Sequence, residues 1–84
     1  MKIMYYVYIL KSLSSAIHYT GIAKDVELRL KDHNRGKSRF TKGHMPWELI
    51  YQEGPYPTKE ARSKEKYYKT HSGKLYLKSK NVLD

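Results

Sequence analysis

The chain has 84 residues and no cysteine, which leaves room for one domain and excludes both a disulfide framework and a thiolate metal site. Seventeen Lys and Arg residues against eight Asp and Glu residues give a formal charge of +9, and this excess favours polyanions such as nucleic acid as partners. The longest apolar run, residues 4–10, is too short for a transmembrane helix, so we expect one soluble, cytoplasmic domain over residues 1–84 that does not enter a membrane.

The first two predicted elements form a β-hairpin. Residues 5–10 are aromatic or aliphatic on both faces, which is typical of a central strand, and a serine-rich turn separates them from a second strand over residues 17–22. Gly21 ends this strand and allows another group to approach the backbone closely. The hairpin would bring the hydroxyls of Tyr8 and Tyr19 together on one sheet face.

The next segment is predicted to be a helix. Asp25 is a plausible N-cap, and the helix should end near Asn34, where Asn-Arg-Gly supplies a stop signal. Val26 and Leu30 are four residues apart and should face inward.

Residues 36–46 contain Gly, Ser, Thr and Pro among basic side chains, which predicts an exposed loop without regular structure. The carboxylate-free run of cations in and beside it comprises Arg35, Lys37, Arg39 and Lys42. We expect these four residues to bind nucleic acid. The alternative for each single cation is ordinary solvation of an exposed face.

Alternating side chains predict a third strand over residues 47–52, which the Gly and Pro residues at 54–57 should break. Thr58 would cap a second helix over residues 59–71, and residues 72–73 (Ser-Gly) would stop it.

Residues 74–81 fit either a helical turn or a strand. The order strand, strand, helix, strand, helix predicts an α+β domain in which helices pack on a small sheet.

One acidic residue of the second helix occupies an unusual position. Its face of the helix is otherwise small, aromatic or hydroxylic, and comprises Ala61, Glu65, Tyr68 and Ser72. A carboxylate in such a stripe loses solvation unless it meets a cation or a metal. The alternative is that Glu65 forms an ordinary surface ion pair with Lys69 or Arg62.

Arg29 and His33 lie four residues apart at the edge of the inward face of the first helix. A guanidinium there can hold a phosphate through two parallel N–H donors and keeps its charge throughout a reaction. The alternatives are an ion pair of Arg29 with Asp25 or Asp32, and a partly buried helix-end role for His33.

The chain has nine tyrosines, and most are needed to fill the core of so small a domain. Tyr8 and Tyr19 differ from the rest because the hairpin would pair their hydroxyls. A phenol is a poor base at neutral pH unless cations lower its pKa, as Arg29 and a metal would. Otherwise both residues are core tyrosines with satisfied hydroxyls.

These residues fall into a recognisable series of motifs. They are Tyr6-Val7-Tyr8, Tyr19-Thr20-Gly21, Asp25, Arg29, His33, Asn34, Thr41-Lys42-Gly43-His44-Met45-Pro46-Trp47 and Glu65. Together they resemble the GIY-YIG nuclease superfamily over nearly the whole chain, and most closely its small stand-alone bacterial members. Tyr6-Val7-Tyr8 stands where the name-giving pattern has Gly-Ile-Tyr, and it retains the tyrosine.

The resemblance implies a three-stranded antiparallel sheet flanked by helices and one divalent metal, Mg2+ or Mn2+, held by Glu65. Water would attack the phosphodiester in line, with Tyr19 as the general base and Tyr8 as its hydrogen-bonding neighbour. Arg29 matches the phosphate-binding arginine, and His33 matches a position that is often polar and catalytic.

Two hypotheses from different classes follow. The first is a metal-dependent endonuclease of repair, recombination or turnover, with DNA favoured over RNA as its substrate. The alternative is a non-catalytic nucleic-acid-binding module that keeps the fold and the basic loop. A third option is a protein-interaction adaptor, whose binding to nucleic acid would vanish at physiological salt.

Overall fold

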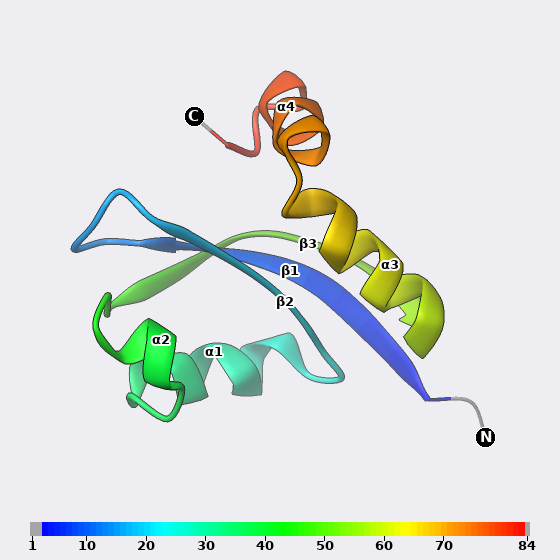
Figure 1. Ribbon diagram of the computed structural model, residues 1–84. Helices are drawn as coiled ribbons and strands as arrows, with labels where there is room; N and C mark the ends of the chain where they lie inside the picture. Colours follow the sequence, from blue (N-terminus) through cyan, green and yellow to red (C-terminus); the bar gives the residue numbers. More distant parts are fainter. Residues whose placement is uncertain (1–2, 84) are drawn as a thin grey trace.

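A computed structural model describes residues 3–83 and contains a three-stranded antiparallel sheet (Figure 1). Its strands are β1 (Met4–Ser12), β2 (His18–Ala23) and β3 (Trp47–Pro57). β1 lies between β2 and β3, which confirms the central position predicted from its two-sided apolar pattern.

Four helices cover the two faces of the sheet. α1 (Val26–Asn34) and α2 (Arg39–Lys42) lie on one face, and α3 (Thr58–Tyr68) and α4 (His71–Ser79) lie on the other (Figure 1). The α+β class and the antiparallel sheet are therefore confirmed. No helix within residues 3–83 has the length and apolar character needed to cross a membrane.

The alternation of side chains along β1 divides the core into two clusters. Val7 and Ile9 are completely buried under α3 and α4, while Tyr8 and Leu10 are buried on the face that carries α1. Tyr8 is thus a core residue and a candidate site residue at once.

The first helix follows the prediction. The Asp25 carboxylate accepts a hydrogen bond from the Leu28 amide at 3.0 Å and caps α1, and the helix ends at Asn34. Gly36 follows with φ of +77°, the left-handed region that glycine favours.

The prediction that residues 36–46 lack regular structure is wrong for Arg39–Lys42, which form α2. Thr41 is completely buried, and its carbonyl accepts a hydrogen bond from the Trp47 indole at 2.9 Å. A four-residue helix is too short to be stable on local propensity, so these long-range contacts hold it.

The predicted break after the third strand is also wrong, because β3 continues to Pro57. The register shifts between Tyr5 and Val7 of β1, so that Gly54 and Pro55 form a bulge rather than an end. β3 is an edge strand, and an edge strand tolerates a proline that cannot donate to a ladder.

The predicted second helix is divided into two. α3 starts at Thr58, with Pro57 rather than Thr58 at the N-cap, and it ends at Tyr68. Thr70 then caps α4 by accepting a hydrogen bond from the Gly73 amide at 3.1 Å. Residues 72–73 therefore begin a helix instead of stopping one, Ser72 does not share a helix with Glu65, and residues 74–81 are mainly helical.

A carboxylate joins β3 to α3. Glu53 accepts hydrogen bonds from the hydroxyls of Tyr51 and Tyr56, each at 2.7 Å, and from the hydroxyl of Tyr68. The Lys64 ammonium lies 3.8 Å from the same carboxylate. Because Tyr68 is on the helix that carries Glu65, this cluster fixes α3 against the sheet.

Candidate active site

The register of the hairpin places Tyr8 directly opposite Gly21. The Tyr8 ring occupies the space above this glycine: a Cβ added at Gly21 would lie 2.8 Å from the Tyr8 hydroxyl oxygen and 3.0 Å from a ring carbon of Tyr19. The groups that approach the backbone at Gly21 are therefore the rings of Tyr8 and Tyr19.

Gly21→Ala should lower the free energy of unfolding by about 1–3 kcal/mol, because the methyl group would force the rings of Tyr8 and Tyr19 to move. Gly43→Ala is the matched control, since a Cβ there meets no heavy atom within 4 Å. Urea unfolding of both variants tests this prediction, and equal stabilities would contradict it.

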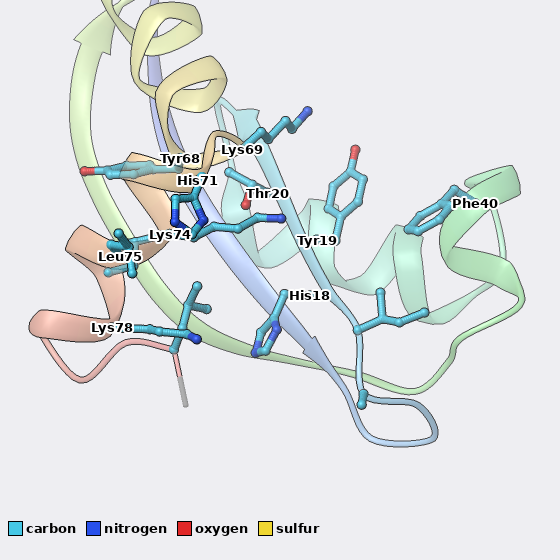
Figure 2. A pocket seen from close by; sticks show the side chains of 14 residues that line it. His18, Tyr19, Thr20, Phe40, Tyr68, Lys69, His71, Lys74, Leu75 and Lys78 are labelled. Atoms are coloured by element: carbon cyan, nitrogen blue, oxygen red, sulfur yellow. The ribbon is translucent and has the colours of Figure 1, made fainter.

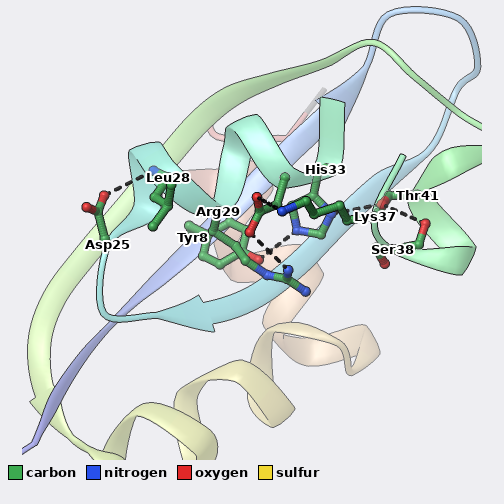
Figure 3. A network of polar contacts seen from close by, with 9 residues as sticks. Tyr8, Asp25, Leu28, Arg29, His33, Lys37, Ser38 and Thr41 are labelled. Atoms are coloured by element: carbon green, nitrogen blue, oxygen red, sulfur yellow. Dashed lines mark hydrogen bonds and ion pairs between the residues drawn. The ribbon is translucent and has the colours of Figure 1, made fainter. Parts of the chain in front are cut away.

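A chain of hydrogen bonds starts at Tyr8 and passes through α1 to α2 (Figure 3). The Tyr8 hydroxyl lies 2.9 Å from Nε2 of His33, and Nδ1 of His33 lies 2.8 Å from Oγ1 of Thr41. The Thr41 hydroxyl donates to the Ser38 carbonyl at 3.4 Å. It must therefore accept from Nδ1–H of His33, which leaves Nε2 to accept from the Tyr8 hydroxyl.

The electrostatics of the two central groups agree with this proton arrangement. Burial, and secondly the charge of Arg29, lower the pKa of His33, which favours the neutral imidazole. Burial, and secondly the neighbouring Tyr19, raise the pKa of Tyr8 far above its ordinary value, although Arg29 partly offsets the rise. Tyr8 is thus a phenol that keeps its own proton and donates a hydrogen bond to Nε2 of His33.

The lowered pKa of His33 makes stability depend on pH. Below the ordinary pKa of 6.5, the unfolded chain gains a proton that the folded protein resists. Stability should therefore be full above pH 6.5 and fall on acidification, by at most about 1.4 kcal/mol per pH unit for this one group. His33→Gln should unfold with a flatter pH profile than the parent. Identical profiles for parent and His33→Gln would refute this.

The remaining predicted residues surround Tyr8. The ring centroid of Tyr19 lies 6.2 Å from that of Tyr8 and 4.8 Å from that of His33. Arg29 lies beside Tyr8 (Figure 3), and it partly offsets the rise in the pKa of Tyr8. The structure therefore brings groups from β1, β2 and α1 together, and Glu65 lies on α3.

The ordinary ion pairs considered as alternatives are also present. The Arg29 guanidinium lies 3.9 Å from the Asp32 carboxylate, and the Lys69 ammonium lies 3.3 Å from the Glu65 carboxylate. The Arg29 side chain is 38% exposed and that of Glu65 is 21% exposed. Both groups remain open to solvent on one side, so neither ion pair closes the site.

The predicted basic segment lies next to these groups. Its four cations, Arg35, Lys37, Arg39 and Lys42, are all exposed. Lys37 pairs with Asp32 at 3.5 Å. Since Thr41 of α2 bonds to His33, the segment is anchored to the site rather than extended from it.

Sequence reasoning missed the contacts by which three residues hold this anchor. The Asn34 side chain accepts from the Trp47 amide at 2.6 Å and donates to the Trp47 carbonyl at 3.1 Å. Together with buried Thr41, this pair fixes α1, α2 and the start of β3. Asn34 was predicted to stop the helix and was included in the motif series, but an amide that satisfies both backbone groups of a distant residue leaves no local signal of that contact.

Glu65 can be tested as a metal ligand on chemical grounds. Within residues 3–83, no group of three or more His, Asp or Glu side chains is placed to hold a metal. A single carboxylate nevertheless suits Mg2+, which keeps several waters and binds through one or two carboxylates together with substrate phosphate. The partly exposed Glu65 fits that mode of binding.

Comparison with known proteins identifies the family of the chain. The GIY-YIG catalytic domain family matches residues 4–81. A UPF0213 protein of Staphylococcus epidermidis is 45% identical over 76 residues, which cover 88% of this chain and 90% of the relative. A UPF0213 protein of Staphylococcus aureus is 42% identical with the same coverage. No solved structure gives a significant match. The chain therefore belongs to the GIY-YIG catalytic domain family, a family of nucleases.

Proposed function

We propose that the protein is a divalent-metal-dependent endonuclease that hydrolyses phosphodiester bonds in nucleic acid, with DNA favoured over RNA. Two observations support this proposal: the match to the GIY-YIG catalytic domain family over residues 4–81, and the cluster of Tyr8, Tyr19 and His33 beside Arg29. Glu65 on α3 is the carboxylate that we assign to the same site.

Each group has a defined task in phosphodiester hydrolysis. Arg29 would bind the non-bridging oxygens and stabilise the charge that grows on them. Glu65 would hold Mg2+ or Mn2+, which supplies charge neutralisation at the leaving oxygen when bound. Lys69, paired with Glu65, would orient this carboxylate.

The two tyrosines are suited to different tasks. Tyr8 is buried and donates its hydroxyl proton in a hydrogen bond to His33, so it is suited to orient its neighbours rather than to meet water. Tyr19 is only half-buried, and it can therefore reach an attacking water. We assign the general base to Tyr19, and we assign positioning of the tyrosine pair to Tyr8 and His33.

The absence of cysteine suits a reducing compartment, and we place the activity in the cytoplasm. The cations Arg35, Lys37, Arg39 and Lys42 would bind the nucleic-acid backbone beside the site.

The test is cleavage of labelled single-stranded, duplex and branched DNA, and of RNA, with Mg2+ or Mn2+. Glu65→Ala and Tyr19→Phe should lose cutting by at least about 100-fold while they retain binding. Exposed Glu60→Ala on the same helix is the control and should cut like the parent. Cutting that survives in both site variants would refute the assignment.

A second candidate is the non-catalytic binding module, which the existing Glu65 to Lys69 ion pair favours. This module would bind nucleic acid equally well in the parent and in both variants, and none of them would cut any substrate. A protein adaptor would instead lose nucleic-acid binding at physiological salt.

A further inference from the structure

A groove of about 730 Å3 lies beside the candidate active site (Figure 2). Side chains of β2 and α4 line it, and Phe40 of α2 stands at one end. In Figure 2, Tyr19 and Phe40 lie on one side of β2, and Lys74 and Lys78 lie on the other. Tyr19 therefore belongs to both the site and the groove.

The lining of the groove is cationic and apolar. Its charged side chains are Lys69, Lys74 and Lys78, and no acidic residue lines it within the described part of the chain. Much of the remaining lining is aliphatic or aromatic, which includes Leu75 and Phe40. The groove thus suits an anion that also carries flat, apolar groups.

Phe40 is the clearest sign of a ligand that stacks. Its side chain is 54% exposed, although it belongs to the helix that anchors His33 through Thr41. The Phe40 and Tyr19 rings lie 6.3 Å apart at an angle of 31°. These two rings offer aromatic surface at the edge of the site, where a base could stack.

A base-paired duplex gains little from such a surface, because its bases already stack on one another and only their edges face outward. An unpaired strand exposes its base faces and carries one phosphate per nucleotide. Proteins that bind single strands combine a cationic groove with aromatic stacking in this way.

We propose that this groove binds an unpaired nucleic-acid strand that continues from the scissile phosphodiester, a proposal that rests on the proposed function. A base stacks on Phe40 next to Tyr19, and the backbone crosses β2 toward Lys74 and Lys78. The substrate class is therefore single-stranded DNA or RNA, or the unpaired arm of a branched molecule.

Fluorescence anisotropy tests this assignment in the presence of EDTA, so that no cutting takes place. The probes are labelled oligothymidylate, oligouridylate and a hairpin duplex of matched length, and the two single strands distinguish DNA from RNA. The intact protein should bind a single strand at least about tenfold more tightly than the duplex.

Two variants and two matched controls locate the binding. Phe40→Ala should weaken single-strand binding roughly tenfold, whereas Leu28→Ala, whose side chain is also 54% exposed but lies outside the groove, should not.

Lys74→Ala with Lys78→Ala should reduce the slope of log K against log salt by roughly 1.4, at about 0.7 per lost phosphate contact. Lys59→Ala with Lys66→Ala removes the same charge from α3 outside the groove and should reduce it less. Thermal unfolding verifies that all variants are folded.

Equal or tighter binding of the duplex would overturn the assignment. The same holds if Phe40→Ala weakens single-strand binding no more than Leu28→Ala does, or if oligoglutamate binds as tightly as oligothymidylate, which would indicate a general anion surface. A protein that binds the single strand as predicted but cuts nothing would refute the proposed function alone. A protein that cuts but binds both strand forms equally would refute the groove assignment alone.

Discussion

Arg29→Ala should lower the rate of phosphodiester cleavage by roughly 100- to 1,000-fold, the loss expected when a charged donor to a developing oxyanion is removed. Arg29→Lys should recover only part of the rate, because an ammonium keeps the charge but lacks the two parallel N–H donors. Single-turnover cleavage at saturating protein measures the chemical step.

Two controls separate catalysis from folding in this experiment. The pair between Arg29 and Asp32 is long, at 3.9 Å, and partly exposed, so its loss should cost less than about 1 kcal/mol of stability. Lys31→Ala removes an exposed cation from the same helix and should leave the rate unchanged. An Arg29→Ala rate equal to that of Lys31→Ala would contradict the proposed role.

Glu53→Ala should destabilise the fold by about 3 kcal/mol. Tyr51, Tyr56 and Tyr68 would each lose a charged acceptor, and hydrogen bonds to charged groups are worth more than neutral ones. For a domain of this size, the melting temperature should fall by roughly 12–24 °C. Glu48→Ala changes an exposed glutamate of the same strand and should cost no more than about 0.5 kcal/mol. Similar melting temperatures for the two variants would show that the cluster does not stabilise α3.

The Glu53 cluster also has a pH signature. Burial alone would raise the pKa of Glu53, but the hydrogen bonds from the three tyrosines outweigh burial and lower it below its ordinary value of 4.5. A lowered carboxylate pKa contributes stability that is present above pH 4.5 and is lost as the pH falls through the folded value. Glu53→Gln should therefore remove part of the acid sensitivity of the parent, which acid titration of thermal unfolding would measure.

The sequence predicted the parts of the fold that local patterns encode. The two-sided apolar run of β1, the Asp25 cap and the end of α1 at Asn34 follow from side-chain spacing and backbone preference. The division between α3 and α4 does not follow from such local patterns. A Cβ at Gly73 would lie 2.0 Å from the Tyr67 carbonyl oxygen, and such a close backbone approach leaves only an isolated glycine in the sequence.

The sequence named the members of the candidate site but not the contacts between them. Spacing placed Arg29 and His33 on one helix and singled out Glu65 on another, and the resemblance gave each of them a role. The hydrogen bond from Tyr8 to His33 joins residues 25 positions apart, and it depends on hairpin register, helix packing and the bare backbone at Gly21 together. Thr41 appeared in the sequence only as part of a motif in a basic loop, and its burial and its contact with Nδ1 of His33 show that it orients the imidazole.

A double-mutant cycle of Arg29→Ala and Glu65→Ala on the cleavage rate tests most directly whether these groups serve one scissile linkage. Groups that act as a unit are strongly non-additive. We predict that the parent cuts in Mg2+ and that the double variant is about as slow as the slower single variant. A double variant slowed by the product of the two single effects, or a parent that cuts no nucleic acid at all, would contradict the account.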